Sequence, residues 1–536
     1  MHRLTKLSKW IHKYIGLVLV LFLMWMSISG ILLNHPHWIA GVSVPSWLVP
    51  EHYDIDNWNR SSLISAVYTG DHNERMIIGG KNGVWESFDG GQTFTSMMGE
   101  GFPQSPYYLK TNHLYKPEGQ PDRLLAATDG GLYQCDLKTE QWKKVALGHH
   151  PEKTKQIVQT DDHLVAFTES NVYRSDLSAH VFDFNQASLE RTEKQRRVSF
   201  IDLFFHLHDG DVFGLSGRLL WDVVGIILFF LSISAFYAWI YPKRKHRRKQ
   251  NGYIRKGKIQ ALMFRLIVRY HIKLGIWVAV ILLIIAGTGL FMRPPLIVAI
   301  AEGDIPAEYY PGILPDNPWE EKIHNALYDA KRDIIVIAAS DGLWQGPADL
   351  SKPFKKVSLN VPIFVMGPQV FQYDINQDRY LVGSFSGMFA YHPQNEQSIN
   401  LITGRPAESY STVRPADYMV TGFFETPDGQ TFITSHEKGL TGLNGAKRDG
   451  RFQLPAEMNE LHSLSLWNFM FELHNGRIFK DFIGSWYILI APLGSMLFLL
   501  IVLSGIWDWL YLKQCKRIKK QQTPSTMGRK RFKKAI

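Results

Sequence analysis

Cysteine is almost absent from this chain of 536 residues, which contains only Cys135 and Cys515. The charge distribution described below places these two residues on opposite sides of a membrane, so we expect no internal disulfide. No C-x-x-C-H motif is present. Its absence excludes covalent attachment of a c-type haem by the usual motif.

Several catalytic and nucleotide-binding motifs are also missing. No Walker motif and no H-E-x-x-H occurs, so ATP-driven transport and zincin-type proteolysis have no support. No G-x-G-x-x-G follows a strand on the cytoplasmic side, and the cytoplasmic connections are too short for a nucleotide or flavin domain. We therefore expect no flavin or nicotinamide site in this chain.

Long apolar runs are present in four places, although the mean hydropathy of −0.12 shows that most of the chain is not embedded in a membrane. Each run reaches the ~20 residues that a helical span requires. The first run exceeds the core of a signal peptide and no small-residue cleavage site follows it, so we expect a retained span. The four predicted spans are about Tyr14–Leu33, Leu219–Tyr241, Leu274–Met292 and Trp486–Leu510.

The basic surplus, a formal net charge of +10, is concentrated at the ends of these spans, in residues 3–13, 243–258 and 513–534. By the positive-inside rule, both termini and the middle connection are cytoplasmic, and both long hydrophilic blocks lie outside. Since topology already accounts for the basic runs, we expect no nucleic-acid partner. The expected partner of the apolar runs is the lipid bilayer.

Both hydrophilic blocks show a β-type repeat. A short apolar strand, a turn with Gly or Asn, and an apolar–aromatic pair recur every 40 to 52 residues within a block, which is the period of propeller blades. Six units, three in each block, predict one six-bladed β-propeller built from both outer loops, because three blades do not close a ring. Two separate β domains are the alternative. The six turns are Asn82-Gly83, Gly130-Gly131, Ser170-Asn171, Asp341-Gly342, Ser386-Gly387 and Lys438-Gly439.

The first unit contains an additional motif, Ser87-Phe88-Asp89-Gly90-Gly91-Gln92-Thr93-Phe94. It resembles the Asp-box hairpin of sialidase-like and photosystem-assembly-type propellers, in which the Asp and Ser side chains hold a turn. We expect a structural role for it rather than a catalytic one.

The whole chain reads as a tandem duplication of span, β block and span. His12, at the start of the first span, returns 259 residues later as His271, and the motif L-H-x-G precedes the second span of each half at His208 and His474. Because each half has two spans, both halves have the same orientation, as in a parallel repeat. Other residues in register are Gly16 with Gly275, Ser29 with Thr288, Gly30 with Gly289, and Ser234 with Ser504.

These four histidines are the candidate metal-binding residues, because an ionisable side chain at a span is a functional hypothesis by default. His12 and His271 lie at the cytoplasmic ends of spans one and three, and His208 and His474 lie at the outer approaches to spans two and four. In a four-helix bundle of two related halves, like positions face each other, and facing imidazoles suit bis-His ligation of haem iron. A structural role at the membrane interface is the alternative for each.

Neighbouring residues extend this hypothesis. Small residues near the histidines make room beside a planar macrocycle, or else let helices approach closely. They are Gly16, Ser27 and Gly30 in the first half, and Gly275, Ala286 and Gly289 in the second. The reserve ligands are His35, His37 and His206, and the candidates for neutralising haem propionates are Arg218, Arg293 and Arg477. Gly210 and Gly476 are expected to break the helix just after His208 and His474.

Three features of the sequence resemble the PepSY-associated transmembrane helix family. They are the H-x-x-x-G start of a span, the run of small residues before an outward Pro, and L-H-x-G ahead of the next span. That family includes bacterial inner-membrane reductases that act on ferric siderophores in the periplasm. The resemblance implies a four-span electron-transfer core with two b-type haems, held by histidines such as His12, His208, His271 and His474. The outer blocks depart from it, since propeller-like units stand in place of the small PepSY modules.

Together, these observations predict an α-helical membrane protein with four transmembrane helices in two tandem repeats and a periplasmic all-β domain. The expected parts are 1–37, 201–242, 266–295 and 466–512 for the spans and their edges, 38–200 and 296–465 for the β blocks, and 243–265 and 513–536 for the cytoplasmic loop and tail. The expected location is the bacterial inner membrane.

The resemblance implies an oxidoreductase that moves electrons through two haem b groups. The expected electron donor is quinol or a separate reductase, and the expected electron acceptor is a periplasmic ferric siderophore or chelate. A non-enzymatic, membrane-anchored propeller for binding or assembly is the alternative.

Overall fold

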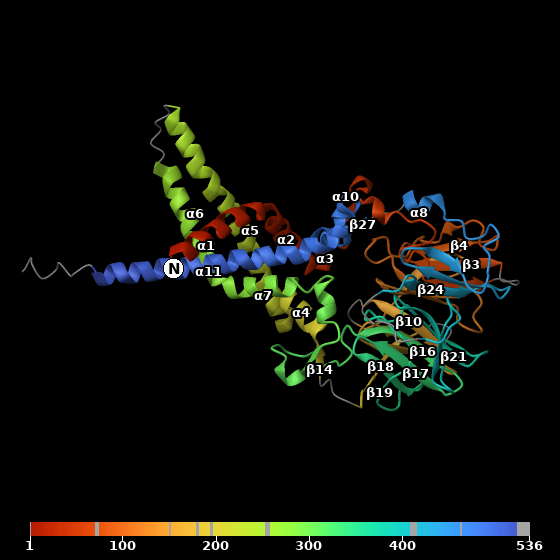
Figure 1. The fold of residues 1–536 in the computed structure, drawn as a ribbon. Coiled ribbons are helices and arrows are strands. Elements are labelled where there is room, and N and C mark those ends of the chain that lie inside the picture. Colours follow the sequence, from red (N-terminus) through yellow and green to blue (C-terminus); the bar gives the residue numbers. More distant parts are fainter. Residues whose placement is uncertain are drawn as a thin grey trace, which may run out of the picture.

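The computed structural model describes residues 2–69, 74–148, 152–177, 182–192, 197–251, 258–407, 415–460 and 464–522. Long helices form one part of the molecule and β-sheets form the other (Figure 1). The part of the basic loop at 252–257 and the basic tail after residue 522 lie outside the described residues.

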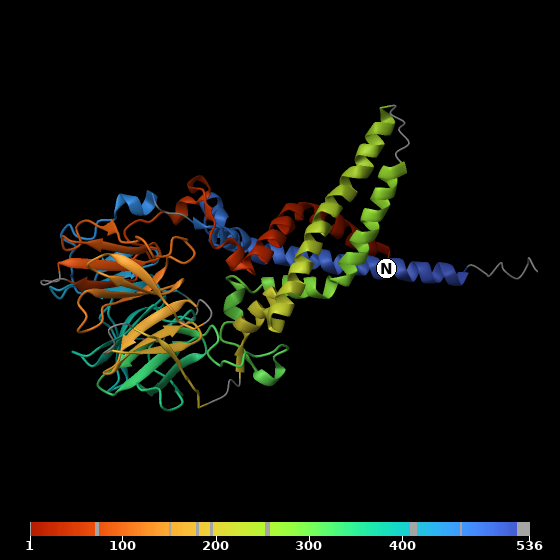
Figure 2. The same cartoon turned by 180° about the vertical axis from the view of Figure 1, so that it is seen from behind.

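Four apolar stretches are helical, as expected. Two of them are long enough to cross a membrane as single helices, in the ranges Asp211–Arg247 and Arg477–Cys515, and two are bent pairs, at 63° and 65°. Figure 2 shows α5 and α6 projecting together beyond the other helices. The helices of these four stretches are α1 (His2–Val18) with α2 (Val20–Leu33), α5 (Gly214–Gln250), α6 (Lys258–Trp277) with α7 (Ala279–Gly289), and α11 (Ile490–Gln522).

The two bends occupy equivalent positions in the two halves. The first bend is at Leu19 and the second is at Val278, 259 residues later. No proline lies at either bend, and each bend follows a glycine of the H-x-x-x-G motif by three residues, Gly16 or Gly275. Glycine is among the residues at which helices kink, because it lowers the cost of leaving helical geometry.

A short helix leads into each of the long single helices: α4 (Phe200–Asp209) and α9 (Leu466–Asn475). A serine hydroxyl accepts a hydrogen bond from a backbone N–H of the first turn in both cases. Gly210 and Gly476 end the helices with φ of 89° and 79°. A Cβ atom on Gly210 would lie 2.8 Å from the Gly217 carbonyl oxygen, and one on Gly476 would lie 2.8 Å from Ile490 Cβ. The expected helix breaks are therefore present, and both positions require glycine.

The β part consists, among the described residues, of five four-stranded antiparallel sheets and one three-stranded sheet. The second strand of each sheet is almost fully buried, because neighbouring sheets cover both of its faces. This burial explains the continuous apolar runs in the sequence. The strands are β2 (Ser65–Thr69), β3 (Arg75–Gly80), β4 (Gly83–Ser87), β5 (Thr95–Ser96); β6 (Thr111–Tyr115), β7 (Arg123–Thr128), β8 (Gly131–Asp136), β9 (Gln141–Val145); β10 (Thr154–Gln159), β11 (His163–Thr168), β12 (Val172–Asp176), β13 (Asn185–Ala187); β16 (Ile323–Asp329), β17 (Ile334–Ala339), β18 (Gly342–Pro347), β19 (Lys355–Val357); β20 (Val370–Asp374), β21 (Arg379–Ser384), β22 (Gly387–His392), β23 (Gln397–Asn400); β24 (Val420–Glu425), β25 (Thr431–Ser435) and β26 (Gly439–Gly442).

These sheets form a propeller-like ring. The first strand of each sheet packs on the first strand of the next, in the order β2, β6, β10, β16, β20, β24, and β24 packs back on β2. The two hydrophilic blocks share hydrophobic cores, one of which joins Met76 and Trp85 to Phe424 and Phe432. The Thr434 hydroxyl also donates to the Leu63 carbonyl at 2.7 Å. Both blocks therefore contribute to one body.

Two small antiparallel pairs connect the sheets to the helices. β1 (Ser43–Val44) pairs with β27 (Leu464–Ser465), and β14 (Arg197–Ser199) pairs with β15 (Asp304–Pro306). Each pair joins the chain leaving one span to the chain approaching another. The remaining short helices are α3 (Pro36–Ile39), α8 (Ala456–Glu460) and α10 (Lys480–Ile483), and the 3-10 turns are η1 (Ser46–Leu48), η2 (Glu51–Tyr53), η3 (Asp211–Phe213), η4 (Leu296–Ala299), η5 (Ala307–Tyr309), η6 (Arg477–Phe479) and η7 (Gly484–Leu489).

The Asp-box motif forms the expected structural turn. The Asp89 carboxylate accepts hydrogen bonds from the backbone N–H groups of Gln92 and Thr93, both at 2.9 Å, and from the Ser87 hydroxyl at 2.7 Å. These hydrogen bonds hold the pKa of Asp89 at about 2, below its usual value. All of its partners belong to the same turn.

Candidate functional site

The structure brings His12 and His271 together at one end of the helical part. His12 lies on α1 and His271 on α6, and their ring centroids are 6.3 Å apart with ring planes at 83°. The duplication predicted that these two residues are equivalent, and the fold places them opposite each other.

Each of these two histidines is held through its Nδ1 atom. His12 Nδ1 lies 3.1 Å from the Ile501 carbonyl oxygen and 3.3 Å from the Ser504 hydroxyl of α11. His271 Nδ1 lies 2.7 Å from the Ser234 hydroxyl of α5. The two serines are themselves equivalent in the two halves, so the same contact is built twice.

His208 and His474 form a second pair with the same design. His208 lies on α4 and His474 on α9, with ring centroids 6.2 Å apart and ring planes at 77°. His208 Nδ1 lies 3.1 Å from the Thr288 hydroxyl and 3.1 Å from the Ile285 carbonyl oxygen. His474 Nδ1 lies 2.8 Å from the Ser29 hydroxyl. The helix breaks at Gly210 and Gly476 do not prevent this pairing.

The hydrogen bonds assign the same tautomer to all four rings. A carbonyl oxygen only accepts, so Nδ1 of His12 and of His208 carries the proton. The Ser234 hydroxyl donates its proton to the Leu231 carbonyl, and the Ser29 hydroxyl donates to the Trp25 carbonyl. Both hydroxyls therefore accept from the histidine. Nε2 of each ring carries the lone pair, and in the described part of the chain it makes no hydrogen bond.

This geometry fits a metal between the rings of each pair. A metal–imidazole bond of about 2.0–2.1 Å, plus about 1.1 Å from nitrogen to ring centre, puts two opposed centroids about 6.2–6.4 Å apart. Metal-binding histidines commonly donate their other N–H group to a fixed acceptor, which sets the tautomer and the ring orientation. No group of three or more His, Cys, Asp or Glu capable of holding a metal ion occurs among the described residues.

A cavity of about 430 Å³ adjoins the His12–His271 pair. Its walls are mostly apolar, with Leu23, Leu231 and Phe498 among them, and Lys9 and Asp508 also line it. This volume falls within the ~300–1,000 Å³ of ligand-binding sites. The residues at this pair therefore fit a large, largely apolar, planar group such as haem.

The small residues divide into two groups in the structure. Gly16 lines the cavity, and a Cβ atom added to it would meet nothing within 4 Å. In contrast, a Cβ atom on Gly30 would lie 3.6 Å from His474 Cε1, and one on Gly289 would lie 3.2 Å from His208 Cε1. Gly289 thus makes room for the His208 imidazole, whereas a Cβ atom at Gly30 would be in ordinary van der Waals contact with His474. Gly505, which the sequence did not indicate, makes room for His12, since a Cβ atom there would lie 3.0 Å from Cε1.

The reserve histidines have other partners. His35 Nε2 lies 2.6 Å from the Asp222 carboxylate, and the His35 ring stacks on Trp38 at 3.9 Å. His206 Nδ1 lies 2.9 Å from the Tyr310 hydroxyl. His37 lies edge-on to His35, with ring centroids 5.9 Å apart.

The three candidate arginines differ in how far they are paired. Arg218 bonds the Asp211 carboxylate at 2.6 Å. Arg477 bonds the fully buried Glu472 carboxylate, with its Nε 2.7 Å from one oxygen. Arg293 Nε is buried without a hydrogen-bond partner, and its guanidinium lies 5.7 Å from the Tyr487 ring centre. Arg293 is therefore the best placed of the three to meet a carboxylate from a bound group.

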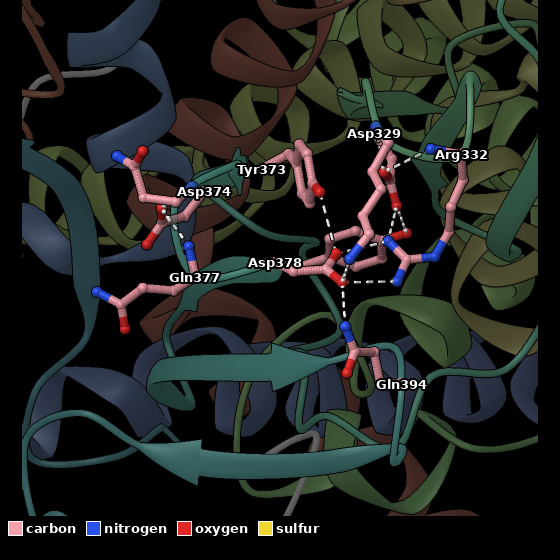
Figure 3. A network of polar contacts seen from close by, with 10 residues as sticks. Asp329, Arg332, Tyr373, Asp374, Gln377, Asp378 and Gln394 are labelled. Carbon is pink, nitrogen blue, oxygen red and sulfur yellow. Dashed lines mark hydrogen bonds and ion pairs between the residues drawn. The ribbon is translucent and has the colours of Figure 1, made fainter.

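A polar network between two neighbouring sheets is separate from the histidine pairs (Figure 3). Arg332 bonds both Asp329 and Asp378, at 2.7 and 2.8 Å, and Tyr373 and Gln394 donate to Asp378. Hydrogen bonds from Arg332 and Lys331 hold the pKa of Asp378 well below its usual range. Because its carboxylates are fully paired, the network joins the two sheets and supplies no free catalytic group.

Comparisons with solved structures give matches at low similarity. The extracellular domain of a protein described as a one component system from B. thetaiotaomicron is 11% identical, with a TM-score of 0.33, over 72% of this chain and 39% of that chain. YCF48 from Cyanidioschyzon merolae is 10% identical, with a TM-score of 0.32, over 72% and 82%. The β-propeller domain of Cps50 (Swd1) from Myceliophteria thermophila is 9% identical, with a TM-score of 0.29, over 72% and 88%. Likenesses at this level carry no argument about function.

Comparison with curated proteins gives no match. A family model described as the PepSY-associated TM region matches residues 9–331. The match covers three of the four helical stretches, the first hydrophilic block, and the residues His12, His208 and His271. It includes more than half of the chain, and it agrees with the motifs that the sequence contains. The chain belongs to the PepSY-associated TM region family.

Proposed function

We propose that this protein is a membrane oxidoreductase that holds two b-type haems and carries electrons outward to a periplasmic ferric siderophore or other ferric chelate. His12 and His271 would hold one haem, and His208 and His474 the other. The observation that carries the proposal is the repeated geometry: two imidazole pairs, 6.2 and 6.3 Å apart, each with Nδ1 bonded and Nε2 free.

The proposal includes a topology. Each of the four helical stretches would cross the inner membrane once, including the two bent pairs, and the six sheets would form one six-bladed propeller in the periplasm. The basic runs at 3–13 and 243–258 and the basic tail support cytoplasmic termini. The His12–His271 pair would then lie toward the cytoplasm, and the His208–His474 pair toward the propeller.

The spacing along α11 supports a path between the two pairs. The Ser504 hydroxyl contacts His12, while Ser495 lies beside Gly289, against which His208 packs. Nine residues of α-helix span about 14 Å. In the proposed topology the two sites would therefore lie one above the other across the membrane rather than side by side.

The protein residues would fix and shield the redox sites. The Ser and Thr hydroxyls and the two carbonyl oxygens would hold the imidazoles in one tautomer and one orientation, and this raises the basicity of Nε2. The apolar walls around the His12–His271 cavity keep water away and lower the local dielectric. Haem, when bound, supplies one-electron transfer between its ferric and ferrous states.

The reaction balances with a two-electron donor and a one-electron acceptor. One quinol would be oxidised to quinone with release of two protons, and its two electrons would reduce two ferric chelates to the ferrous state. A separate reductase protein is the other source of electrons, because the sequence contains no nucleotide or flavin motif.

Oxidised and dithionite-reduced absorbance spectra of the purified protein, with haem quantified per chain, test the proposal. The expected result is two b-type haems per chain, falling to one in His12→Ala and in His474→Ala. No haem, in protein from cells supplied with it, would reject the oxidoreductase and leave a membrane-anchored propeller that binds or assembles other molecules.

A further inference from the structure

One end of the propeller-like ring presents lysines at equivalent positions. Lys110 and Lys153 directly precede the innermost strands β6 and β10. In each case the lysine carbonyl accepts a hydrogen bond from the turn between the second and third strands of the same sheet, at 2.9 and 3.0 Å. The backbone frame is therefore the same in the two sheets, and the two side chains start from the same end of the ring.

This end of the ring faces the helices that carry the outer histidine pair. The Ser105 hydroxyl donates to the Ala40 carbonyl, which links the ring to the segment after α3. Tyr107, just before Lys110, packs on Trp467 of α9, with ring centroids 5.5 Å apart. Because His474 also lies on α9, the lysine-bearing end of the ring is close to the outer pair.

The positive charge at this end is only partly balanced. We call Arg60, Lys81, Lys110, Lys153 and Lys155 the basic face. Lys153 and Lys155 lie 3.6 and 3.9 Å from the Glu169 carboxylate, and the negative charge of Asp129 also acts on both lysines. In the described part of the chain, Arg60, Lys81 and Lys110 form no ion pair. The basic face therefore retains a net positive charge.

The environment of Lys81 reflects the positive charge of the basic face. Its Nζ lies 4.6 Å from the Tyr53 ring centre. Burial lowers the pKa of Lys81 to about 7, with further lowering by Arg60, Arg477 and Lys110 and opposition from Glu472. The protonated form of Lys81 thus lacks a full counter-charge, which a bound anion would supply.

A cavity lies beside Lys81. Its volume is about 270 Å³, and its walls combine Lys81, Gln104 and Leu109 of the ring with Asn468 of α9. The mixed polar and apolar lining suits a small ligand with several oxygen atoms. Ring and helix together enclose this space, so a ligand here would touch the element that holds His474.

We propose that the basic face and this cavity bind a small polyanion, of the class of metal chelates bearing several carboxylate or phenolate groups, between the propeller and the outer histidine pair. As the identity of an electron acceptor, this rests on the proposed function. As a binding site, it stands on the lysine register, the unpaired cations and the cavity. Charge-assisted hydrogen bonds from lysine to such oxygens are about twice as strong as neutral ones.

Gallium citrate is the probe, because it resembles an anionic ferric chelate but is not reduced, so binding is measured without electron transfer. Binding is measured by calorimetry on the full-length protein in nanodiscs of zwitterionic lipid, for the wild type and for a Lys81→Gln, Lys110→Gln, Lys153→Gln variant. Lys143→Gln, an exposed lysine on the outer strand β9, is the matched control. Loss of three charges is expected to weaken binding by about 100-fold or more, with the control within about two-fold.

The outcomes separate this inference from the proposed function. Equal affinity in the triple variant and the control, or no binding at millimolar probe, would overturn the anion site even if the protein holds two haems. Binding that fails only in nanodiscs with anionic lipid would assign the basic face to lipid headgroups and also overturn it. Lysine-dependent binding to a protein without haem would support the site and reject the oxidoreductase. Thermal unfolding at the wild-type temperature shows that the triple variant is folded, whether or not the protein holds haem.

Discussion

Gly16 gives a test of whether a large group occupies the cavity beside His12 and His271. A Cβ atom added at Gly16 meets no protein atom within 4 Å, because the position faces the cavity. A leucine side chain takes up on the order of 100–150 Å³, against a cavity of about 430 Å³. Gly16→Leu should therefore block a planar macrocycle while leaving the surrounding protein undisturbed.

The same substitution should not destabilise the haem-free protein. Leucine is about 0.8 kcal/mol more favourable than glycine in a helix interior. Gly287→Leu on α7 is the matched control, since its Cβ atom also meets nothing within 4 Å and it does not line the cavity. The assay is haem per chain by pyridine haemochrome, alongside thermal unfolding. We expect one haem in Gly16→Leu and two in Gly287→Leu.

Two haems in both glycine variants would refute the reasoning, because a filled cavity has no space for the leucine. One haem in both variants would also refute it, since the loss would then follow from adding leucine to any such helix.

Three further predictions concern the ligands, their acceptors and the basic face. His271→Ala and His474→Ala should each remove one haem, and the double variant should remove both. Reduced absorbance spectra of the three proteins check this. A single variant that keeps two haems would contradict the pairing. Ser234→Ala removes the acceptor of the His271 Nδ1 proton and should speed haem loss about 10- to 100-fold. The rate of haem loss is measured by transfer of haem to apomyoglobin. An unchanged rate of haem loss would show that the hydroxyl does not hold the ring. Gallium citrate affinity should fall as the pH rises above about 7, because Lys81, whose pKa lies near 7, then loses the charge that attracts the anion. A Lys81→Met variant should not show this decrease in affinity. A decrease of equal size in that variant would assign the pH dependence to another group.

The sequence indicated that the four histidines form two symmetric pairs, because like positions in a duplicated chain face each other, but it did not decide which histidine lies opposite which. The structure places His12 opposite His271 and His208 opposite His474. The Ser29–Thr288 and Ser234–Ser504 correspondences were visible as well. Their role was not, because hydroxyls near a span more often bond their own helix, and only packing shows which imidazole lies beside them.

The remaining features depended on packing that no sequence pattern carries. The bends at Leu19 and Val278 lie inside continuous apolar runs without proline, so hydropathy predicts unbroken spans there. Gly505 lies in the middle of a long apolar helix, where glycine usually signals only close helix approach. The propeller-like ring was predicted from its period of 40 to 52 residues, while its closure between the first and last sheets needed the contacts of Leu63 with Thr434.

That closure has a consequence for biosynthesis. The sheet of β2–β5 is translated early, yet its neighbour on one side, the sheet of β24–β26, is translated more than 300 residues later, after α5, α6 and α7. Until the second hydrophilic block reaches the same compartment, the first block has two sheets with an uncovered apolar face, which favours aggregation or chaperone binding. In the proposed topology, correct insertion of the middle helices would thus be a precondition for closing the ring, and an error in insertion would leave the ring open.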